Sequence, residues 1–515
     1  MKFSALSRVR YGGKSRFGLV EFGTLLSGCL LFVAPVSVGL AQSYFTPLEK
    51  GDYEIVDEKT GYNPGIQANG YYRAFSLSRR KDLMGDEYSS HMNQIISLKL
   101  QSKLNTNIAV HARIQNRLSL LKNGERGYVS DNPYDEMDST GDNGMDAEFK
   151  EAYLEYNHNP HAILKIGRHE INVGDRKGLI YRGTDTAISQ SCRMGTWCTY
   201  IGGARLGTHD ALYWVQLDYP VFFNDVMIPD PWSEKKERQQ SSLRIELFRV
   251  RYGGKDTPLA NYGGPTSVGS QYHRKDGDDS PVYYNNEEVE YEGVTVLWNY
   301  HDFLLDFSYV LFGGDRVYHT GSQEDGNETK EIGKQDIGGN VFYVDFSYRF
   351  HEKWRFEGVV LGSSGNEPES GKSFWESDST AYLEVQKGHF GKSLVYFDGI
   401  DRMGEGHSVG NLQFRSLGVA YRSLDKSFGF DISYSDYERT KAVLDHEGNE
   451  VRDIGSELDL LSTWWLEERL KFQCYLAVFR PGEAYSPNDN LTPGSSDGDE
   501  DNDVFYLGLN LIYDF

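Results

Sequence analysis

The final segment of the chain, residues 504–515, limits the fold more than any other stretch. Its apolar and aromatic side chains occupy every second position, namely Phe505, Leu507, Leu509, Leu511, Tyr513 and Phe515. The positions between them are mostly polar or small, with Ile512 as the apolar exception. Because successive side chains of a β-strand point to opposite faces, the segment is predicted to be a strand with one apolar face and one wet face.

The same alternation recurs along most of the chain. Apolar side chains occupy every second position in segments such as 96–100, 108–114, 305–311 and 428–434. A repeated wet face needs water and a repeated apolar face needs lipid, which favours an all-β, transmembrane, antiparallel up-and-down β-barrel. A soluble β-sandwich is the alternative, but it leaves the 35 Tyr, the 27 Phe and the long acidic loops without a reason.

Short and long connections alternate between the expected strands. Short ones include 104–107, 157–161, 300–302, 351–353 and 466–469, and long ones include 118–146, 171–199, 314–335 and 480–502. Outer-membrane barrels have short periplasmic turns and long extracellular loops, so we expect about 18 strands. Two stretches stay open at this point. Residues 241–251 are either a membrane strand or part of a loop, and residues 376–400 are either a hairpin or an excursion into the pore.

The amino terminus has the pattern of an export signal. Basic residues between Lys2 and Arg16 precede an apolar run from Phe22 to Leu40, and Ala41 follows. We therefore expect a signal peptide at 1–41, a periplasmic leader or short plug at 42–69, and an outer-membrane β-barrel at 70–515. A retained membrane anchor, or a lipoprotein cleavage site at Cys29, is the alternative. The formal net charge of −23 argues against a nucleic-acid partner.

Strand parity predicts which charged side chains line the lumen. Lys or Arg on a lipid face costs about 2–4 kcal/mol near the bilayer midplane, so charges are expected to point inward. The expected cations are Lys99, Lys103, His111, Arg113, Arg117, Arg349 and Arg355, and the expected anions are Asp306, Asp345, Glu357, Asp431, Glu457 and Asp459. Charges on a pore wall select solutes by sign. The early strands are rich in cations, which suggests an anionic solute but leaves the sign of the selectivity open.

Several motifs occur in an order that resembles the alginate export family of outer-membrane barrels. They are Glu148-Phe149-Lys150-Glu151, Leu164-Lys165-Ile166-Gly167-Arg168-His169-Glu170, Arg402-Met403-Gly404-Glu405, Asp453-Ile454-Gly455-Ser456-Glu457 and Arg480-Pro481-Gly482-Glu483. The resemblance implies an 18-stranded barrel that passes an anionic polysaccharide through an arginine-lined constriction, with periplasmic export components as possible partners. It extends the substrate path to Lys99, Lys150, Arg168 and Arg402, and it implies an inward-folded segment with a gate at 388–406.

A general diffusion porin for small solutes is the alternative function within the same fold. An enzyme is not expected, because the chain contains no Gly-x-Ser-x-Gly elbow and no His-Glu-x-x-His motif, and a strand explains His169-Glu170. An adhesion or surface-structural role is the third reading. No cofactor is expected. Acidic residues at 497–503 have the spacing of a calcium loop but lack its Gly and closing Glu, so no metal is expected either.

Cysteine usage is compatible with an oxidising compartment. Cys192 and Cys198 lie close in sequence in a stretch containing Gly and Ser, where a small disulfide is plausible. A metal pair is the weaker reading because further ligands are not nearby. Cys474 shares the parity of Phe472 and Leu476, which predicts a lipid-facing side chain.

Overall fold

The computed structural model describes most of the chain between residues 66 and 515. The described residues are 66–80, 88–123, 146–159, 161–174, 178–206, 210–229, 237–258, 282–320, 330–365, 393–394, 409–444, 449–467, 469–484 and 503–515. All of them belong to one compact unit, Ile55–Phe515. They form a single antiparallel sheet of 18 strands, which confirms the predicted fold class and strand number.

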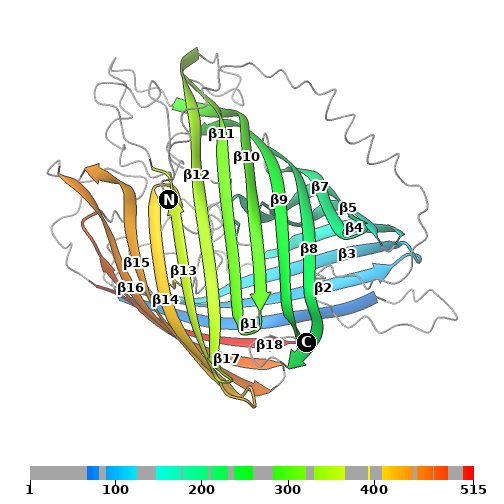
Figure 1. Ribbon diagram of the computed structural model, residues 1–515. Coiled ribbons are helices and arrows are strands. Elements are labelled where there is room, and N and C mark those ends of the chain that lie inside the picture. The colour runs from blue at the N-terminus through cyan, green and yellow to red at the C-terminus, as the bar shows by residue number, and fades with distance from the viewer. Residues whose placement is uncertain are drawn as a thin grey trace. The chain divides into compact units, whose positions relative to one another are not determined.

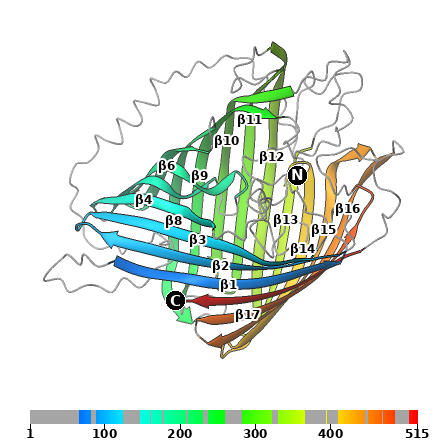
Figure 2. The same cartoon turned by 180° about the vertical axis from the view of Figure 1, so that it is seen from behind.

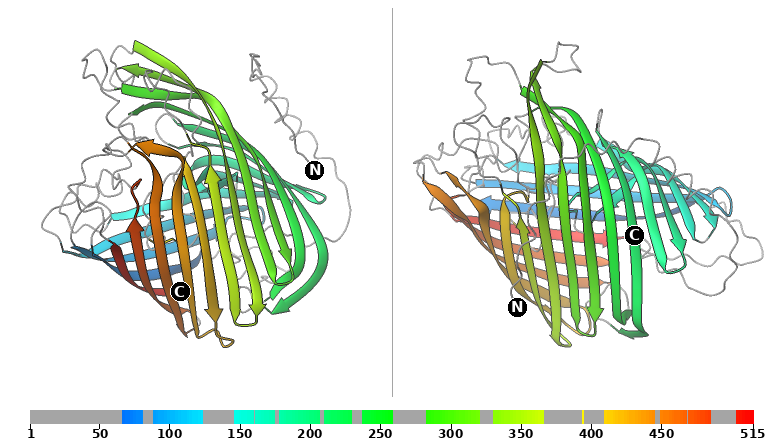
Figure 3. Two further views of the ribbon diagram at one scale, coloured as in Figure 1. Left: turned by 60° about the vertical axis from the view of Figure 1, so that its left-hand side comes forward. Right: turned by 45° about the horizontal axis from the view of Figure 1, so that its top comes forward.

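The strands follow one another around the wall in chain order, and the colours of Figure 3 trace that order. Their bounds are β1 Ile66–Arg80, β2 Tyr88–Lys103, β3 Ile108–Asn123, β4 Asp146–Asn159, β5 Ala162–Val173, β6 Tyr181–Met194, β7 Trp197–Arg205, β8 Ala211–Pro229, β9 Glu237–Pro258, β10 Val282–Tyr300, β11 Phe303–Thr320, β12 Lys330–His351, β13 Trp354–Ser363, β14 Leu412–Arg422, β15 Phe428–Leu444, β16 Glu450–Glu467, β17 Leu470–Pro481 and β18 Val504–Asp514.

The first strand closes the barrel against the last. In β1, Ala74 lies in register with Leu511 of β18 on one side and with Gln94 of β2 on the other. The amide of Phe515 donates to the carbonyl of Gly70 at 2.8 Å and extends this closing ladder. Figure 1 shows β8 to β14 side by side, and Figure 2 shows β1 between β18 and β2 from behind. Closure removes the unpaired strand edges, whose amides each cost several kcal/mol in hydrocarbon.

The terminal strand has the two faces that its alternation predicts. Leu507 is 46% exposed and its apolar neighbours Phe505 and Leu509 are similarly exposed, whereas Tyr506 is 3% exposed. The exposed apolar side chains of this strand lie on the outer, lipid-facing side, because exposed apolar side chains are favourable in hydrocarbon and unfavourable in water. The same register carries Cys474 of β17 opposite Leu509, so Cys474 lies on the outer face as predicted.

The inner face is less polar than the sequence pattern suggests. Trp214, Val250, Tyr291 and Phe312 form one row across β8 to β11, and each lies in register with the next. All four are buried. A Cβ on Gly202 would come within 2.3 Å of the Trp214 ring, so glycine at this position lets the indole pack directly on β7. Part of the barrel interior is therefore packed like a core rather than lined by charge.

Both stretches left open by the sequence have a place in the wall. Residues 241–251 belong to the long strand β9. Strand β13 pairs directly with β14, so the wall closes without a strand from 376–400. Strand β1 begins at Ile66, within the segment 42–69 that was expected to precede the barrel. The expected signal peptide, 1–41, lies outside the described residues. Among the described residues, no helix has the length and apolar character needed to cross a bilayer.

Short hairpin turns connect the strands at one end of the wall. In the turn 104–107, the Asn105 side chain accepts hydrogen bonds from the amides of Asn107 and Ile108, both at 2.8 Å. In the turn 423–427, Asp425 accepts from the amide of Ser427 at 3.1 Å. The turn 301–302 contains His301 at φ 52°, a left-handed conformation that a tight two-residue connection requires. This end corresponds to the periplasmic side of outer-membrane barrels.

Candidate functional site

The inner face of β1 to β5 carries more cations than anions among the described residues, and we call it the basic sector. Its charged and titratable side chains are the cations Arg73, Lys99, Lys103, Arg113 and Lys165, the imidazoles His111 and His169, and the anions Glu151 and Glu155. The inward direction follows from their register with buried neighbours such as Ile95 and Ala109. These strands are consecutive, so the charges form one continuous patch.

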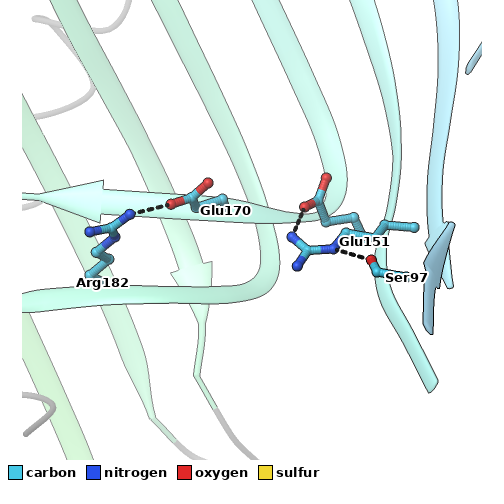
Figure 4. Close-up of polar contacts among 5 residues, drawn as sticks. Ser97, Glu151, Glu170 and Arg182 are labelled. Carbon is cyan, nitrogen blue, oxygen red and sulfur yellow. Dashed lines mark hydrogen bonds and ion pairs between the residues drawn. The ribbon is translucent and has the colours of Figure 1, made fainter. Parts of the chain in front are cut away.

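One row of the basic sector crosses three strands. Lys99 of β2 lies in register with Arg113 of β3, which lies in register with Glu151 of β4. The Arg113 guanidinium donates to the Glu151 carboxylate at 3.0 Å and to the Ser97 hydroxyl at 3.2 Å, and Figure 4 shows Ser97 and Glu151 on either side of it. Arg113 is thus held in place by two neighbours, whereas Lys99 is exposed and presents its charge to solvent.

A stack of rings fills the next part of the sector. The His111 ring lies parallel to Tyr153 at 4.5 Å between centroids, and Lys165 Nζ lies 5.3 Å from the centroid of the same Tyr ring. His169 is buried, with Nε2 2.8 Å from the Ser189 hydroxyl. An ammonium over an aromatic face is attracted by the ring quadrupole. The stack therefore braces Lys165 against the wall and keeps its charge on the inner side.

His169 and Glu170 lie on opposite faces of β5. His169 is in register with Asp185 on the inner face, while Glu170 pairs with Arg182 at 3.5 Å on the outer face (Figure 4). Adjacent strand residues cannot converge on one substrate atom, so this pair forms no acid–base couple.

The remainder of the wall has charges of both signs that pair locally. Arg244 contacts Asp218 and Glu246 on β8 and β9, and Arg422 contacts Asp431 at 3.3 Å between β14 and β15. Arg355 pairs with Glu357 two positions along β13. Other predicted inner acids lie next to one another: Asp306 and Asp345 are in register on β11 and β12, and Glu457 and Asp459 share the inner face of β16. The basic sector is therefore set apart from these acidic parts of the wall by its excess of cations.

One contact joins the inside of the wall to the segment between β13 and β14. Glu457 of β16 accepts hydrogen bonds from the Ser393 hydroxyl at 2.9 Å, from the Leu394 amide at 2.7 Å and from the Tyr437 hydroxyl at 2.9 Å. Glu457 is buried and lies on the inner face. Ser393 and Leu394 thus lie inside the barrel, within the expected gate 388–406, whose other residues lie outside the described ones. Sequence parity pointed to Glu457 but not to its partners.

Three of the predicted path residues lie on the inner parity: Lys99, Arg113 and Arg355. Lys150 occupies a bulge, because the β3–β4 register steps from Glu151 directly to Phe149. Arg117 belongs to β3, but its side chain lies outside the described ones, as does the whole of Arg402.

Arg168 differs from its prediction. It lies in register with Ala152 and Thr186 and shares the face of Ile166, which is 43% exposed on the outer side. The prediction followed the family motif, whereas strict alternation from Ile166 gives the outer face. The charge is tolerated there because Arg168 lies beyond the apolar outer positions of β5, Leu164 and Ile166.

The cysteines do not form the disulfide that their spacing made plausible. Both Cys192 and Cys198 are free thiols. In the β6–β7 hairpin Cys192 lies in register with Thr199 and Cys198 with Arg193, so the two side chains occupy opposite faces. Among the described side chains, no group of three or more His, Cys, Asp or Glu is placed to hold a metal ion.

No family model matches the chain, and no curated protein matches its sequence. Solved structures do match in fold. A BenF-like porin from Pseudomonas fluorescens Pf-5 matches with a TM-score of 0.51 at 11% identity, over 88% of this chain and 100% of that one. Pseudomonas aeruginosa OccK2 (OpdF) in complex with glucuronate matches with a TM-score of 0.50 at 11% identity, over 88% and 99%. Acinetobacter baumannii OccAB2 matches with a TM-score of 0.50 at 13% identity, over 88% and 99%.

The fold is that of a bacterial outer-membrane porin. At these identities the likeness concerns the fold alone, and the matched proteins described as porins are channels rather than enzymes. The resemblance to the alginate export family is correct only at its coarser level, as an outer-membrane barrel of 18 strands. None of these comparisons supports alginate export.

Proposed function

We propose that the protein is a diffusion channel of the bacterial outer membrane that passes small anionic solutes, in particular carboxylates of the size of a single sugar acid. The observation that carries the proposal is the basic sector: a continuous inner patch on β1 to β5 in which cations outnumber anions. A closed barrel of this strand number encloses an aqueous lumen, and its wall charges act on every solute that enters.

The physical basis is electrostatic attraction without tight binding. The inner cations raise the local concentration of anions, since the low-dielectric wall focuses their field into the lumen. Arg113 forms an ion pair with Glu151, which partly neutralises its charge. It therefore attracts a solute carboxylate weakly and does not exchange Glu151 for it permanently. Lys99 is exposed and offers a mobile, strongly hydrated charge. Weak, repeated contacts of this kind favour passage over retention.

Glucuronate provides a concrete size and charge for the solute. It accompanies OccK2 in the solved structure that matches this fold. It has one carboxylate on a single sugar ring, which suits a wall whose cations are separated by polar and aromatic side chains. An anionic polysaccharide, as the motif resemblance implied, would use the same cations along its length but finds no support among the comparisons.

The test combines ion selectivity with solute passage. In planar bilayers under a KCl gradient, the wild-type channel is expected to have a reversal potential of the sign that indicates greater permeability to chloride than to potassium. Lys99→Gln should reduce its magnitude, and Arg249→Gln, on the outer face, should leave it unchanged. In liposome swelling, glucuronate should enter faster than glucose, which has nearly the same size but no charge.

Two results would decide against the proposal. A wild-type channel that prefers potassium, or one that passes glucose faster than glucuronate, removes the anionic-solute function and leaves an unspecific pore. Current blocked by a uronate polymer but indifferent to the monomer would instead favour polysaccharide export.

A further inference from the structure

Five arginines lie on the outer face of β5 to β9. The set is Arg168, Arg182, Arg205, Arg249 and Arg251, which we call the arginine belt. Its first row runs Arg168, Thr186 and Arg205 across β5, β6 and β7 in direct register. The arginines of β5 and β7 thus flank a single threonine of β6 on the outer face.

The row immediately below is apolar. Ile166, Ile188, Gly203 and Tyr213 follow one another in register across β5 to β8. Ile188 is 58% exposed and Tyr213 is 50% exposed, so this row faces hydrocarbon. Single strand steps therefore separate lipid-facing side chains from arginines. This is the level of the lipid headgroups, where an aromatic residue such as Tyr213 is also at home.

Two further outward arginines on β9 do not lie beyond the apolar row. Arg251 lies in register with Tyr213 itself, and Arg249 lies one row nearer the short turns, in register with Val215, where it contacts Glu290 and Glu292 of β10. On the outer parity of β5 to β9, the described residues beyond the apolar row include one acid, Glu170, which pairs with Arg182 (Figure 4). Cations therefore exceed anions on this part of the outer surface.

Arg182 and Arg205 lie toward the strand ends remote from the short turns, which is the outer-leaflet side of the membrane. Arginine recognises phosphate through paired N–H donors, and each basic residue near an anionic membrane surface strengthens lipid binding severalfold. The apolar row below offers a surface for acyl chains at the required distance from the cations.

We propose that the outer face of β5 to β7 is a binding site for a phosphorylated glycolipid of the outer leaflet. Arg168 and Arg205 bind its phosphate groups, and Ile166, Ile188 and Tyr213 contact its acyl chains. This site is separate from the lumen, because the strands that carry it present His169 and Ala204 to the other side. The site also gives Arg168 a function that the lumen does not.

The experiment measures binding of lipid A, a phosphorylated glucosamine disaccharide with acyl chains, to the purified full-length protein in zwitterionic detergent by native mass spectrometry. The test variant is the double substitution Arg168→Gln and Arg205→Gln. The matched control is Arg113→Gln, which removes an arginine from the inner face. The heat-dependent gel shift of a folded barrel verifies that each variant is intact.

We expect the double variant to bind lipid A about 25-fold more weakly than wild type, since each arginine contributes about fivefold. Arg113→Gln should bind as wild type does. Dephosphorylated lipid A should bind wild type at the weakened level, and inorganic phosphate should fail to displace lipid A, which separates a lipid site from an anion site.

Three outcomes would overturn the proposal. One is equal binding of lipid A to the double variant and wild type. Another is equal binding of lipid A and its dephosphorylated form to wild type, a comparison that requires no variant to fold. The third is displacement by inorganic phosphate at the concentration of the lipid.

Discussion

The inner and outer faces of β3 to β7 use arginine in two different ways. On the inner face, Arg113 is fixed by Glu151 and Ser97 within the polar wall of the lumen. On the outer face, Arg168 and Arg205 flank Thr186 in one row, and the adjacent row consists of Ile166, Ile188 and Gly203. The same side chain thus meets water and a carboxylate on one side, and the boundary between lipid and water on the other.

The difference teaches that parity and height along the strand together determine what a charge does in a barrel. Parity selects the lumen or the membrane side. Height decides whether an outward charge lies in hydrocarbon, where it costs several kcal/mol, or at the headgroups, where it is stabilised. A charged residue indicates which solutes the channel passes only when its strand parity and its height along the strand both place it in the lumen.

The largest effect is expected when a charge is moved onto the outer apolar face. Leu509→Lys, at the centre of β18 on the exposed parity, should destabilise the barrel by about 2–4 kcal/mol. Asn69→Lys, at an exposed position on the inner parity of the neighbouring strand β1, should change stability by less than about 1 kcal/mol, since water solvates the new charge. Urea unfolding in lipid vesicles measures both, and equal costs would show that the two faces are not distinct.

The next effect concerns adjacent glycines of β7 that face opposite sides. Gly202→Ala should cost about 1–3 kcal/mol, because its Cβ would lie 2.3 Å from the buried Trp214 ring. Gly203→Ala should cost less, since its Cβ would meet the exposed Tyr213 ring at 3.0 Å, and that ring can move toward lipid. Unfolding followed by tryptophan fluorescence compares them. A larger cost at Gly203 would contradict the packed interior of β7 and β8.

A smaller effect sharpens the electrostatic side of the comparison. Glu151→Gln removes the carboxylate that faces Arg113, so the inner sector gains net positive charge. Anion preference should increase, and the reversal potential should move slightly further toward the chloride equilibrium value. Glu170→Gln, on the outer face of the next strand, is the control and should leave selectivity unaltered. A shift for Glu170→Gln alone would reverse the assignment of faces on β5.

The smallest effect is expected outside the wall altogether. In the turn 423–427, hydrogen bonds lower the pKa of Asp425 from its ordinary value of 3.8. The bond with the Ser423 side chain has the largest effect, and those with Ser427 follow. A lowered pKa in the folded state stabilises the protein above the unfolded value, and this stabilisation is lost as pH falls through the folded value, below 3.8. Asp425→Asn should reduce the loss of stability at acidic pH, as measured by unfolding midpoints across a pH series. An unchanged pH profile would show that these hydrogen bonds contribute nothing to stability.

Strand alternation was sufficient to predict the barrel and its strand number. The pattern of residues 504–515 and its repeats requires a lipid-facing side, which gave the barrel and the approximate number of strands. The turn lengths were less accurate: the expected long connection 171–199 is wrong, because it contains strand β6, Tyr181–Met194. Alternation fails where both faces are apolar. In β8, Leu212 and Trp214 are interleaved with Tyr213 and Val215, so the sequence could not show which pair packs inside.

The site was predicted in part, for identifiable reasons. Parity alone placed Lys99 and Arg113 on one inner face, but the motif resemblance moved Arg168 away from the face that its own neighbours indicate. The contact of Glu457 with Ser393 had no local signal, because the two residues are far apart in sequence and no periodicity links them. The bulge at Lys150 likewise depends on the register between two strands.

The most direct measurement is the reversal potential of wild type, Arg113→Ala and Arg168→Ala channels in planar bilayers under the same KCl gradient. We predict that Arg113→Ala shifts the potential toward potassium, because it removes a cation from the lumen wall. Arg168→Ala should match wild type, because its charge lies on the membrane side. A shift in Arg168→Ala together with none in Arg113→Ala would contradict the assignment of inner and outer faces, and with it the anion pathway.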